Sequence, residues 1–263
     1  MCWSGEASAV LATIGLGTAV YVARKGESKE LYVPLVYFAL MELLQAFTYV
    51  YIDLCGNLNN QILTLFGYVH IAFQPFFVNM IAMYFIPKEV KEKIFVYVYA
   101  VCAVTALMMV VKMYPFANTG ACDYGLEVFC GPELCSVSGD WHIAWMMPLN
   151  DIWSDPMAYG IANTRGLHGV GYIVGGFLLP FLYGSWRFVT FHLFAGPIIS
   201  LATTSDPNEY AAVWCLFSIA LCVSVIKTPI RAQLHVSRWP FYKQLMASKE
   251  DDDDSLTPSR EAM

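Results

Sequence analysis

The sequence predicts an all-α protein, an integral membrane bundle of seven transmembrane helices with its N-terminus outside and its C-terminus in the cytoplasm. Three observations predict this fold class. The 263-residue chain is 57% hydrophobic and only 14% charged, whereas soluble domains are about 25% charged. Its apolar residues gather in long runs. Its basic residues gather between alternate runs, as they do in proteins that cross a membrane several times.

Seven apolar runs are predicted to cross the membrane as helices. Most of them are close to the roughly 17–25 residues that a helix needs to cross the hydrocarbon core. Backbone groups inside a membrane are satisfied only in helices or closed barrels, so we expect these runs to be helical. The sixth and seventh runs are short, and Gly196 and Pro197 interrupt the sixth. The expected spans are residues 7–23, 31–54, 62–86, 94–113, 168–186, 188–204 and 210–226.

The orientation follows from the Lys and Arg residues. Thirteen of the fifteen fall in segments that would share one side of a seven-span bundle, and basic segments stay in the cytoplasm. We therefore expect residues 1–226 to form the transmembrane domain, with a long outer loop at about 114–167. Residues 227–263 are expected to be a cytoplasmic tail, first basic and then acidic, and largely disordered.

The cysteines are distributed unevenly between the two sides. None lies in a predicted cytoplasmic segment, whereas Cys2, Cys55, Cys122, Cys130 and Cys135 all lie on the predicted outer side, where disulfides persist. The disulfide candidates are Cys55, Cys122, Cys130 and Cys135, with one bridge tying Cys55 to the outer loop; the connectivity is open. A metal site at Cys130 and Cys135 is the alternative, but their spacing is looser than that of a zinc knuckle and no second pair follows.

The outer loop contains the stretch "GDWHIAWMMPLNDIW". Tryptophans concentrate where a membrane meets water, so we expect Trp141, Trp145 and Trp153 to lie at that interface. The alternative is that this segment, with Asp140 and His142, forms a lid over a cavity that faces outward.

Polar side chains line one face of the second predicted span. Glu42, Gln45, Tyr49 and Asp53 are spaced by three, four and four residues, which places them on one side of a helix. Ionisable side chains inside a membrane usually face the bundle interior or a wet cavity. This stripe therefore predicts a polar cavity that opens to the outer face.

The third predicted span contains His70 and Gln74, one helical turn apart. Consecutive antiparallel helices are usually neighbours. Counted from the predicted span ends, His70 lies at the depth of Gln45, and Gln74 at the depth of Glu42. We expect these four residues to meet in one layer; the alternative is that they form only hydrogen bonds between helices.

The fifth predicted span adds two residues to this region. His168 lies at its outer mouth, and Tyr172 lies one turn deeper. Gly171 and Gly175 form a small-xxx-small pair, which favours close helix packing over a ligand site.

These residues lead to three hypotheses about function. The first is a transporter or sensor that binds a small ligand, an ion or a proton through Glu42, Gln45, Tyr49, His70, Gln74, His168 and Tyr172. The second is a membrane-embedded metal-dependent hydrolase or redox enzyme. Its metal ligands would be His70, His168 and Glu42, and its cofactor would be an ion such as zinc. The third is a structural or assembly protein. The expected partners are the lipid bilayer and a small molecule or ion, without nucleic acid; the sequence leaves the oligomeric state open.

The opening "MCWS", the segment "DWHIAW" and the segment "ANTRGLHGVGYIVGG" resemble those of an uncharacterised family of polytopic membrane proteins. The resemblance implies a seven-span architecture. It implies no activity and no catalytic residues, because no settled function is known for that family.

Overall fold

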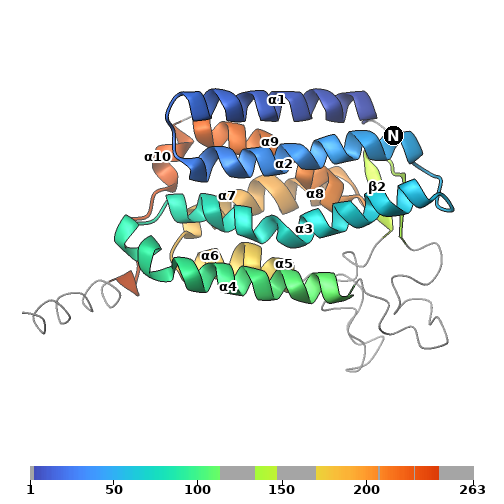
Figure 1. Cartoon of the computed structure of the whole chain (residues 1–263). Helices are drawn as coiled ribbons and strands as arrows, with labels where there is room; N and C mark the ends of the chain where they lie inside the picture. Colours follow the sequence, from blue (N-terminus) through green and yellow to red (C-terminus); the bar gives the residue numbers. More distant parts are fainter. Residues whose placement is uncertain (1–2, 113–133, 147–169, 207, 228, 243–263) are drawn as a thin grey trace, which may run out of the picture.

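The computed structural model describes residues 3–112, 134–146, 170–206, 208–227 and 229–242. They form a bundle of antiparallel helices with a β-hairpin at one end, beside the N-terminus (Figure 1). The long helices are α1 (Gly5–Arg24), α2 (Lys29–Thr48), α3 (Leu58–Tyr84) and α4 (Lys88–Lys112). The second half contains α5 (Val170–Ile173), η5 (Val174–Leu178), α6 (Leu179–Leu182), α7 (Trp186–Leu193), η6 (Phe194–Ile198), α8 (Ile199–Thr203), α9 (Tyr210–Lys227) and α10 (Ile230–Leu234).

Polar side chains fix where the first three helices begin. Ser4 accepts a hydrogen bond from the backbone N–H of Ala7, and Ser28 accepts one from that of Glu30. The Asn57 side chain accepts one from the N–H of Asn59. The first turn of a helix leaves its N–H groups without intrahelical partners, and these side chains satisfy one in each helix.

Four helices are long and apolar enough to cross a membrane: Gly5–Arg24, Lys29–Tyr51, Leu58–Tyr84 and Lys88–Val110. They correspond to the first four predicted spans. The second span, however, ends three residues earlier than predicted, in the 3₁₀ turn η1 (Tyr49–Tyr51). Asp53 has a positive φ of 65°, a conformation outside the helical region. Asp53 is therefore not part of the helical face that carries Glu42, which corrects the predicted stripe.

Small residues bring the helices of the bundle close together. A Cβ added to Gly15 on α1 would lie 2.8 Å from the Cβ of Ala39 on α2. A Cβ at Gly171 would lie 2.9 Å from the Thr105 carbonyl oxygen of α4, and one at Gly175 would lie 2.9 Å from the Cβ of Pro75 on α3. Gly171 and Gly175 therefore serve close helix packing, as their spacing indicates.

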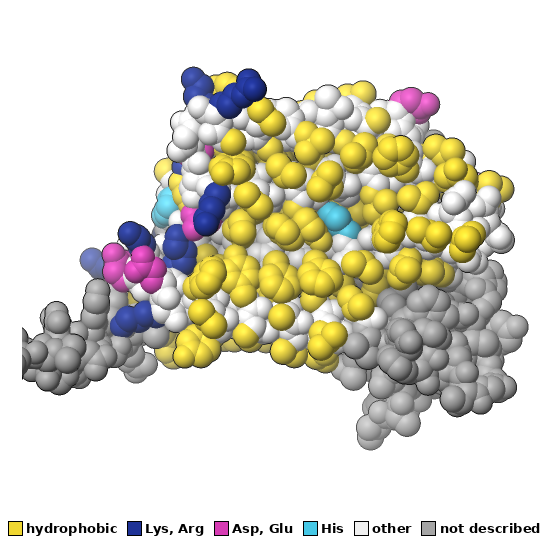
Figure 2. Space-filling view, viewed as in Figure 1, with side chains coloured by type: hydrophobic (Ala, Val, Ile, Leu, Met, Phe, Trp, Pro, Cys, Tyr) yellow, Lys and Arg dark blue, Asp and Glu magenta, His cyan; other side chains and the backbone are white. Residues whose placement is uncertain are grey.

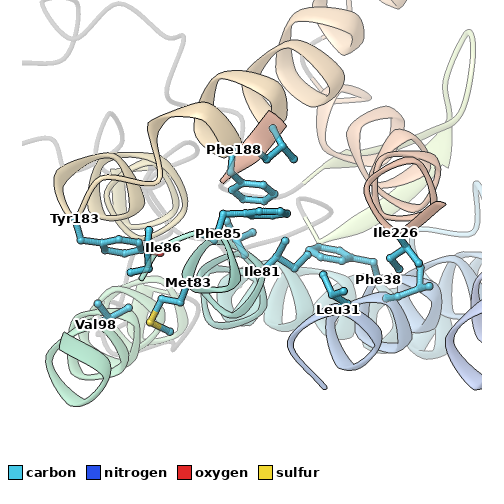
Figure 3. Packing of buried hydrophobic residues seen from close by; sticks show 14 of the residues in the cluster. Leu31, Phe38, Ile81, Met83, Phe85, Ile86, Val98, Tyr183, Phe188 and Ile226 are labelled. Carbon is cyan, nitrogen blue, oxygen red and sulfur yellow. The ribbon is translucent and has the colours of Figure 1, made fainter. Parts of the chain in front are cut away.

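The apolar core of the half that lies away from the hairpin joins the first four helices to the second half of the chain (Figure 3). Phe85, at the end of α3, stacks on Phe188 of α7 with ring centroids 5.8 Å apart. Around this pair lie Leu31, Phe38, Ile81, Ile86, Val98, Tyr183 and Ile226. Stacked aromatic rings contribute about 0.5–1.5 kcal/mol beyond their burial, so this cluster fixes α7 against α3.

A β-hairpin is the exception to the predicted all-α fold. Strand β1 (Cys135–Ser138) pairs antiparallel with β2 (Ile143–Met146), and Ser138 lies opposite Ile143. It arises from the expected outer loop, and the disulfide Cys55–Cys135 ties it to the segment between α2 and α3. The expected bridge from Cys55 to this loop is thus present; Cys122 and Cys130 lie outside the described residues.

The C-terminal segment packs on the opposite end of the bundle from the hairpin (Figure 1). The Trp239 indole donates to the Leu182 carbonyl, and the Val236 N–H donates to that of Phe85. Arg231 forms a bidentate ion pair with Glu27, with N···O distances of 3.0 and 2.8 Å. Residues 229–242 of the expected tail therefore pack against the bundle.

Candidate functional site

Hydrogen bonds hold the hairpin across the ends of α2 and α3. The Asn60 side chain on α3 exchanges two hydrogen bonds with the backbone of Ser136, at 2.8 and 2.9 Å. The Asp53 carboxylate accepts from the backbone N–H and the hydroxyl of Ser138, at 2.7 and 2.6 Å. Asp53 thus fixes β1 instead of lining a cavity. The segment with Asp140 and His142, for which the sequence left a lid as the alternative, thus contributes to this hairpin and its turn.

A buried carboxylate holds the turn of the hairpin. Glu209, just before α9, is 0% exposed. It accepts hydrogen bonds from the backbone N–H groups of Trp141 and His142, at 2.8 and 3.1 Å, and from the Thr204 hydroxyl. A Cβ added to Gly139 would lie 1.8 Å from its Oε1 atom. The turn therefore requires glycine at position 139, because the carboxylate occupies the place of a side chain.

Beneath the hairpin, five polar side chains form what we call the outer polar site: Ser8, Glu42, Gln45, Tyr49 and His142. Glu42, Gln45 and Tyr49 share one face of α2 and its 3₁₀ extension. Ser8 comes from the first turns of α1, and His142 from the hairpin. Ser8, Glu42 and Gln45 are 0% exposed and His142 is 1% exposed.

Trp3 and Tyr49 connect the two ends of this site. The Trp3 indole donates a 2.8 Å hydrogen bond to Ser8, and its ring lies 5.7 Å from that of His142. The Tyr49 hydroxyl is 2.9 Å from Nδ1 of His142. Ser8 and Tyr49 both interact electrostatically with the Glu42 carboxyl. Hydrogen bonds and ring contacts therefore run from Ser8 through Trp3 and His142 to Tyr49, and Glu42 interacts electrostatically with both ends of this series.

The tautomer of His142 follows from its neighbours. The backbone N–H of Ile143 donates to Nδ1 at 2.8 Å, so Nδ1 carries no proton and the neutral ring bears its proton on Nε2. Burial lowers the pKa of His142 to about 3, because a charged imidazolium would lose its hydration. His142 is thus neutral at physiological pH and presents an N–H donor at Nε2.

The main feature of the outer polar site is its unsatisfied polar atoms. Among the described residues, neither oxygen of Glu42 has a hydrogen bond of good geometry, although Ser8 lies near it. Both polar atoms of the Gln45 amide and Nε2 of His142 are also buried without a partner. Buried polar atoms are nearly always hydrogen-bonded, and each exception costs about 1–3 kcal/mol. Such a cluster is typical of a binding site.

His70 does not belong to this site, which corrects the predicted layer. Its Nε2 donates to the Tyr37 carbonyl at 2.9 Å, the Tyr37 hydroxyl donates to the His70 carbonyl at 2.7 Å, and the two rings stack 3.9 Å apart. His70 thus joins α2 to α3. The predicted depths were wrong because the helix ends differ from the predicted ones. The second helix with its 3₁₀ turn ends at Tyr51 instead of residue 54, and α3 begins at Leu58 instead of residue 62. These shifts of three and four residues move the relative depth by about 10 Å.

Gln74 and Tyr172 meet each other instead of Glu42. The Tyr172 hydroxyl donates to Oε1 of Gln74 at 2.9 Å, and the Gln74 amide contacts the Cys215 sulfur at 3.5 Å. This cluster links α3, α5 and α9. The polar groups of Gln74 and Tyr172 satisfy one another. This pair therefore fits the alternative interpretation, in which such residues form hydrogen bonds between helices.

The predicted metal ligands do not come together in the described part of the chain. His70 is bonded to Tyr37, whereas Glu42 lies in the outer polar site. No group of three His, Cys, Asp or Glu side chains gathers among the described residues as metal ligands would. His168, the third predicted ligand, lies outside those residues.

The sequence did not predict Ser8 of the outer polar site or its hydrogen-bond partner Trp3. A signal for Ser8 was present: Ser8, Ala12, Gly15 and Ala19 recur at spacings of four, three and four residues, and all are buried. Such a stripe of small residues marks the face of a helix that approaches a neighbour closely. Trp3 precedes α1 and has no periodic signal. Trp145 is only 2% exposed and packs in an apolar cluster with Met41 and Tyr68; its place at the membrane interface stays a prediction.

Comparison with known proteins identifies a family without assigning an activity. No curated protein and no solved structure matches the chain. A family of unknown function, DUF5765, matches residues 6–235. This range contains all but the first residue of α1, the described helices through α10, the hairpin and every member of the outer polar site. The chain therefore belongs to the DUF5765 family, whose function is unknown.

Proposed function

We propose that this chain is a membrane protein with seven spans, an outer N-terminus and a cytoplasmic C-terminus. We further propose that its outer polar site binds a small ligand, an ion or a proton, as part of a transporter or a sensor. The observation that carries this proposal is the pair Glu42 and Gln45, which are fully buried and whose side-chain polar atoms lack a hydrogen bond of good geometry among the described residues.

The surface of the bundle supports the membrane part of the proposal. Apolar side chains cover the middle of the face in Figure 2, and Lys and Arg side chains gather at the end away from the hairpin. Large apolar residues are exposed on α1, α3 and α4, including Val10 at 59%, Phe66 at 55% and Val96 at 67%. Lipid would cover such a surface, and the basic end would face the cytoplasm.

The other three spans are proposed from the second half of the chain. The described helices there run as Val170–Leu182, Trp186–Thr203 and Tyr210–Lys227, the first two through the π-helical segments η5 and η6. A π segment within a membrane helix is tolerated where neighbouring helices satisfy the freed backbone groups. One such group is the Gly175 carbonyl, which accepts a 2.7 Å hydrogen bond from Asn79.

The polarity of the outer polar site supports the binding part. An ionisable side chain in a membrane-spanning helix is costly and usually serves transport or ligand recognition. Glu42 could be neutralised by a bound cation, by a proton, or by hydrogen bonds from a polar ligand. The sequence predicted a cavity open to the outside; in this structure Glu42 and Gln45 are 0% exposed and the hairpin lies over them. Binding therefore requires this end to open.

A thermal-stability screen tests the proposal. The purified full chain and its Glu42→Gln variant would be heated in detergent with sodium, potassium, amino acids, amines and sugars. At least one compound should raise the unfolding temperature of the original chain and leave that of the variant unchanged. Glu92→Gln is the matched control, because Glu92 makes only an exposed pair with Lys88. The proposal is contradicted if no compound raises the unfolding temperature of the original chain, or if every compound that does so raises that of Glu42→Gln equally.

A further inference from the structure

We infer that the ligand of the outer polar site is a small molecule that carries both a primary ammonium group and an oxygen acceptor, such as an amino alcohol or an amino acid. This inference rests on the proposed function and adds the chemical class of the ligand to it.

The unpartnered atoms of the site include both acceptors and donors. The acceptors are the two carboxyl oxygens of Glu42 and Oε1 of Gln45. The donors are Nε2 of Gln45 and Nε2 of His142, the latter because Nδ1 accepts hydrogen bonds from Ile143 and Tyr49. The orientation of the Gln45 amide does not affect this inventory, since both of its polar atoms lack partners.

The unpartnered oxygens of Glu42 and Gln45, together with the acidic nature of Glu42, favour an ammonium group on the ligand. The described ion pairs, Lys88–Glu92, Lys91–Glu30 and Arg231–Glu27, leave Glu42 out, and all of them join residues at the α10 end. Within the described ranges, the ionisable groups whose interaction with Glu42 is shown are Tyr49 and Cys215, neither of which is cationic. A carboxyl group buried this deeply stays neutral unless a positive partner accompanies it, and an ammonium group would be such a partner. The three N–H groups of a primary ammonium match the three unpartnered oxygens.

The aromatic rings beside the site favour the same group. Trp3 donates to Ser8 and its ring lies 5.7 Å from that of His142, and the Tyr49 ring lies 5.9 Å from the same histidine. Aromatic rings attract organic cations, most strongly where water is excluded.

The two N–H donors, on Gln45 and His142, favour a hydrogen-bond acceptor on the same ligand. A bare metal ion would satisfy the oxygens but would leave the N–H groups of Gln45 and His142 without an acceptor. His142 could not act as a metal ligand in this tautomer, because its Nδ1 lone pair is already used by Ile143. A hydroxyl or carboxylate oxygen next to the ammonium group would accept from both donors.

Isothermal titration of the purified full chain at pH 7 tests the inference with four probes. Ethanolamine and glycine carry both required groups, choline has no N–H on its cationic nitrogen, and sodium has no acceptor. We expect ethanolamine or glycine to bind at least tenfold more tightly than choline and sodium. Glu42→Gln should weaken that binding roughly 10- to 100-fold, as expected for the loss of a hydrogen bond to a charged group. Glu92→Gln should leave it unchanged.

A second variant separates a direct contact from a folding effect. His142→Phe keeps the ring packing against Trp3 and removes the donor, so it should weaken glycine more than it weakens methylamine, which has no oxygen. Sodium or choline binding as tightly as the amines, or amine binding that is unchanged in Glu42→Gln, overturns the inference. If another class of compound binds at Glu42, only the inference fails; if no probe or panel compound binds, the proposed function fails as well.

Discussion

Replacing Gly139 by alanine should release the turn of the hairpin. The new Cβ would lie 1.8 Å from Oε1, 2.4 Å from Cδ and 2.6 Å from Cγ of Glu209. Glu209 is fully buried and accepts three hydrogen bonds. Its carboxylate must therefore move out of the turn if a Cβ is added at position 139.

The magnitude follows from the hydrogen bonds that are lost. Glu209 accepts from the backbone N–H groups of Trp141 and His142, and a hydrogen bond to a charged group contributes about 1.5–3 kcal/mol. Water can replace part of this at Trp141, whose side chain is 48% exposed. We therefore expect the opening free energy of the hairpin to fall by about 2–4 kcal/mol, which is a roughly 30- to 1,000-fold increase in opening.

Hydrogen–deuterium exchange of the peptide that covers residues 134–146 measures this opening in detergent. Gly56→Ala is the control, because a Cβ there meets nothing within 4 Å. Exchange in Gly139→Ala that equals exchange in the original chain would refute the reasoning. A double-mutant cycle adds a sharper check: once Glu209→Ala has removed the carboxylate, Gly139→Ala should have little further effect.

Three further predictions concern other parts of the fold. Glu42→Leu should stabilise the chain against denaturant by about 1–3 kcal/mol, since it removes an unpartnered buried carboxyl; a loss of stability would mean that Glu42 is structural. The rate of hydrogen–deuterium exchange in the hairpin, corrected for the intrinsic rate of each amide, should rise as the pH falls from about 6.5 toward 3. The unfolded state then binds the proton that neutral, buried His142 does not, and His142→Gln should flatten this dependence. Arg231→Met should speed tryptic cleavage after Arg238, because it breaks the ion pair to Glu27; this pair is partly exposed, so the cost is about 0.5–1 kcal/mol. Equal cleavage rates would show that the pair does not hold the C-terminal segment.

The sequence alone predicts the helical elements well, because their signals are local. Apolar runs, polar helix starts and clustered basic residues identify the first four long helices and the end of the bundle where charge gathers. The small-xxx-small spacing of Gly171 and Gly175 also correctly indicates close packing. The cysteine distribution indicates a bridge from Cys55 to the outer loop. Each of these inferences depends on neighbours in the chain or on composition.

Only the tertiary structure decides which side chains meet. Helical periodicity places Glu42 and Gln45 on one face of α2, but α2 has neighbours on several sides, and the face turns toward α1 and the hairpin instead of toward His70. The span ends lie three and four residues from their predicted positions, so the depth of His70 relative to Gln45 shifts by about two helical turns, and His70 has Tyr37 as its partner. The hairpin packs His142 against Tyr49, and the two are 93 residues apart. Contacts over such distances depend on helix rotation and depth, and a sequence pattern fixes neither to within one residue.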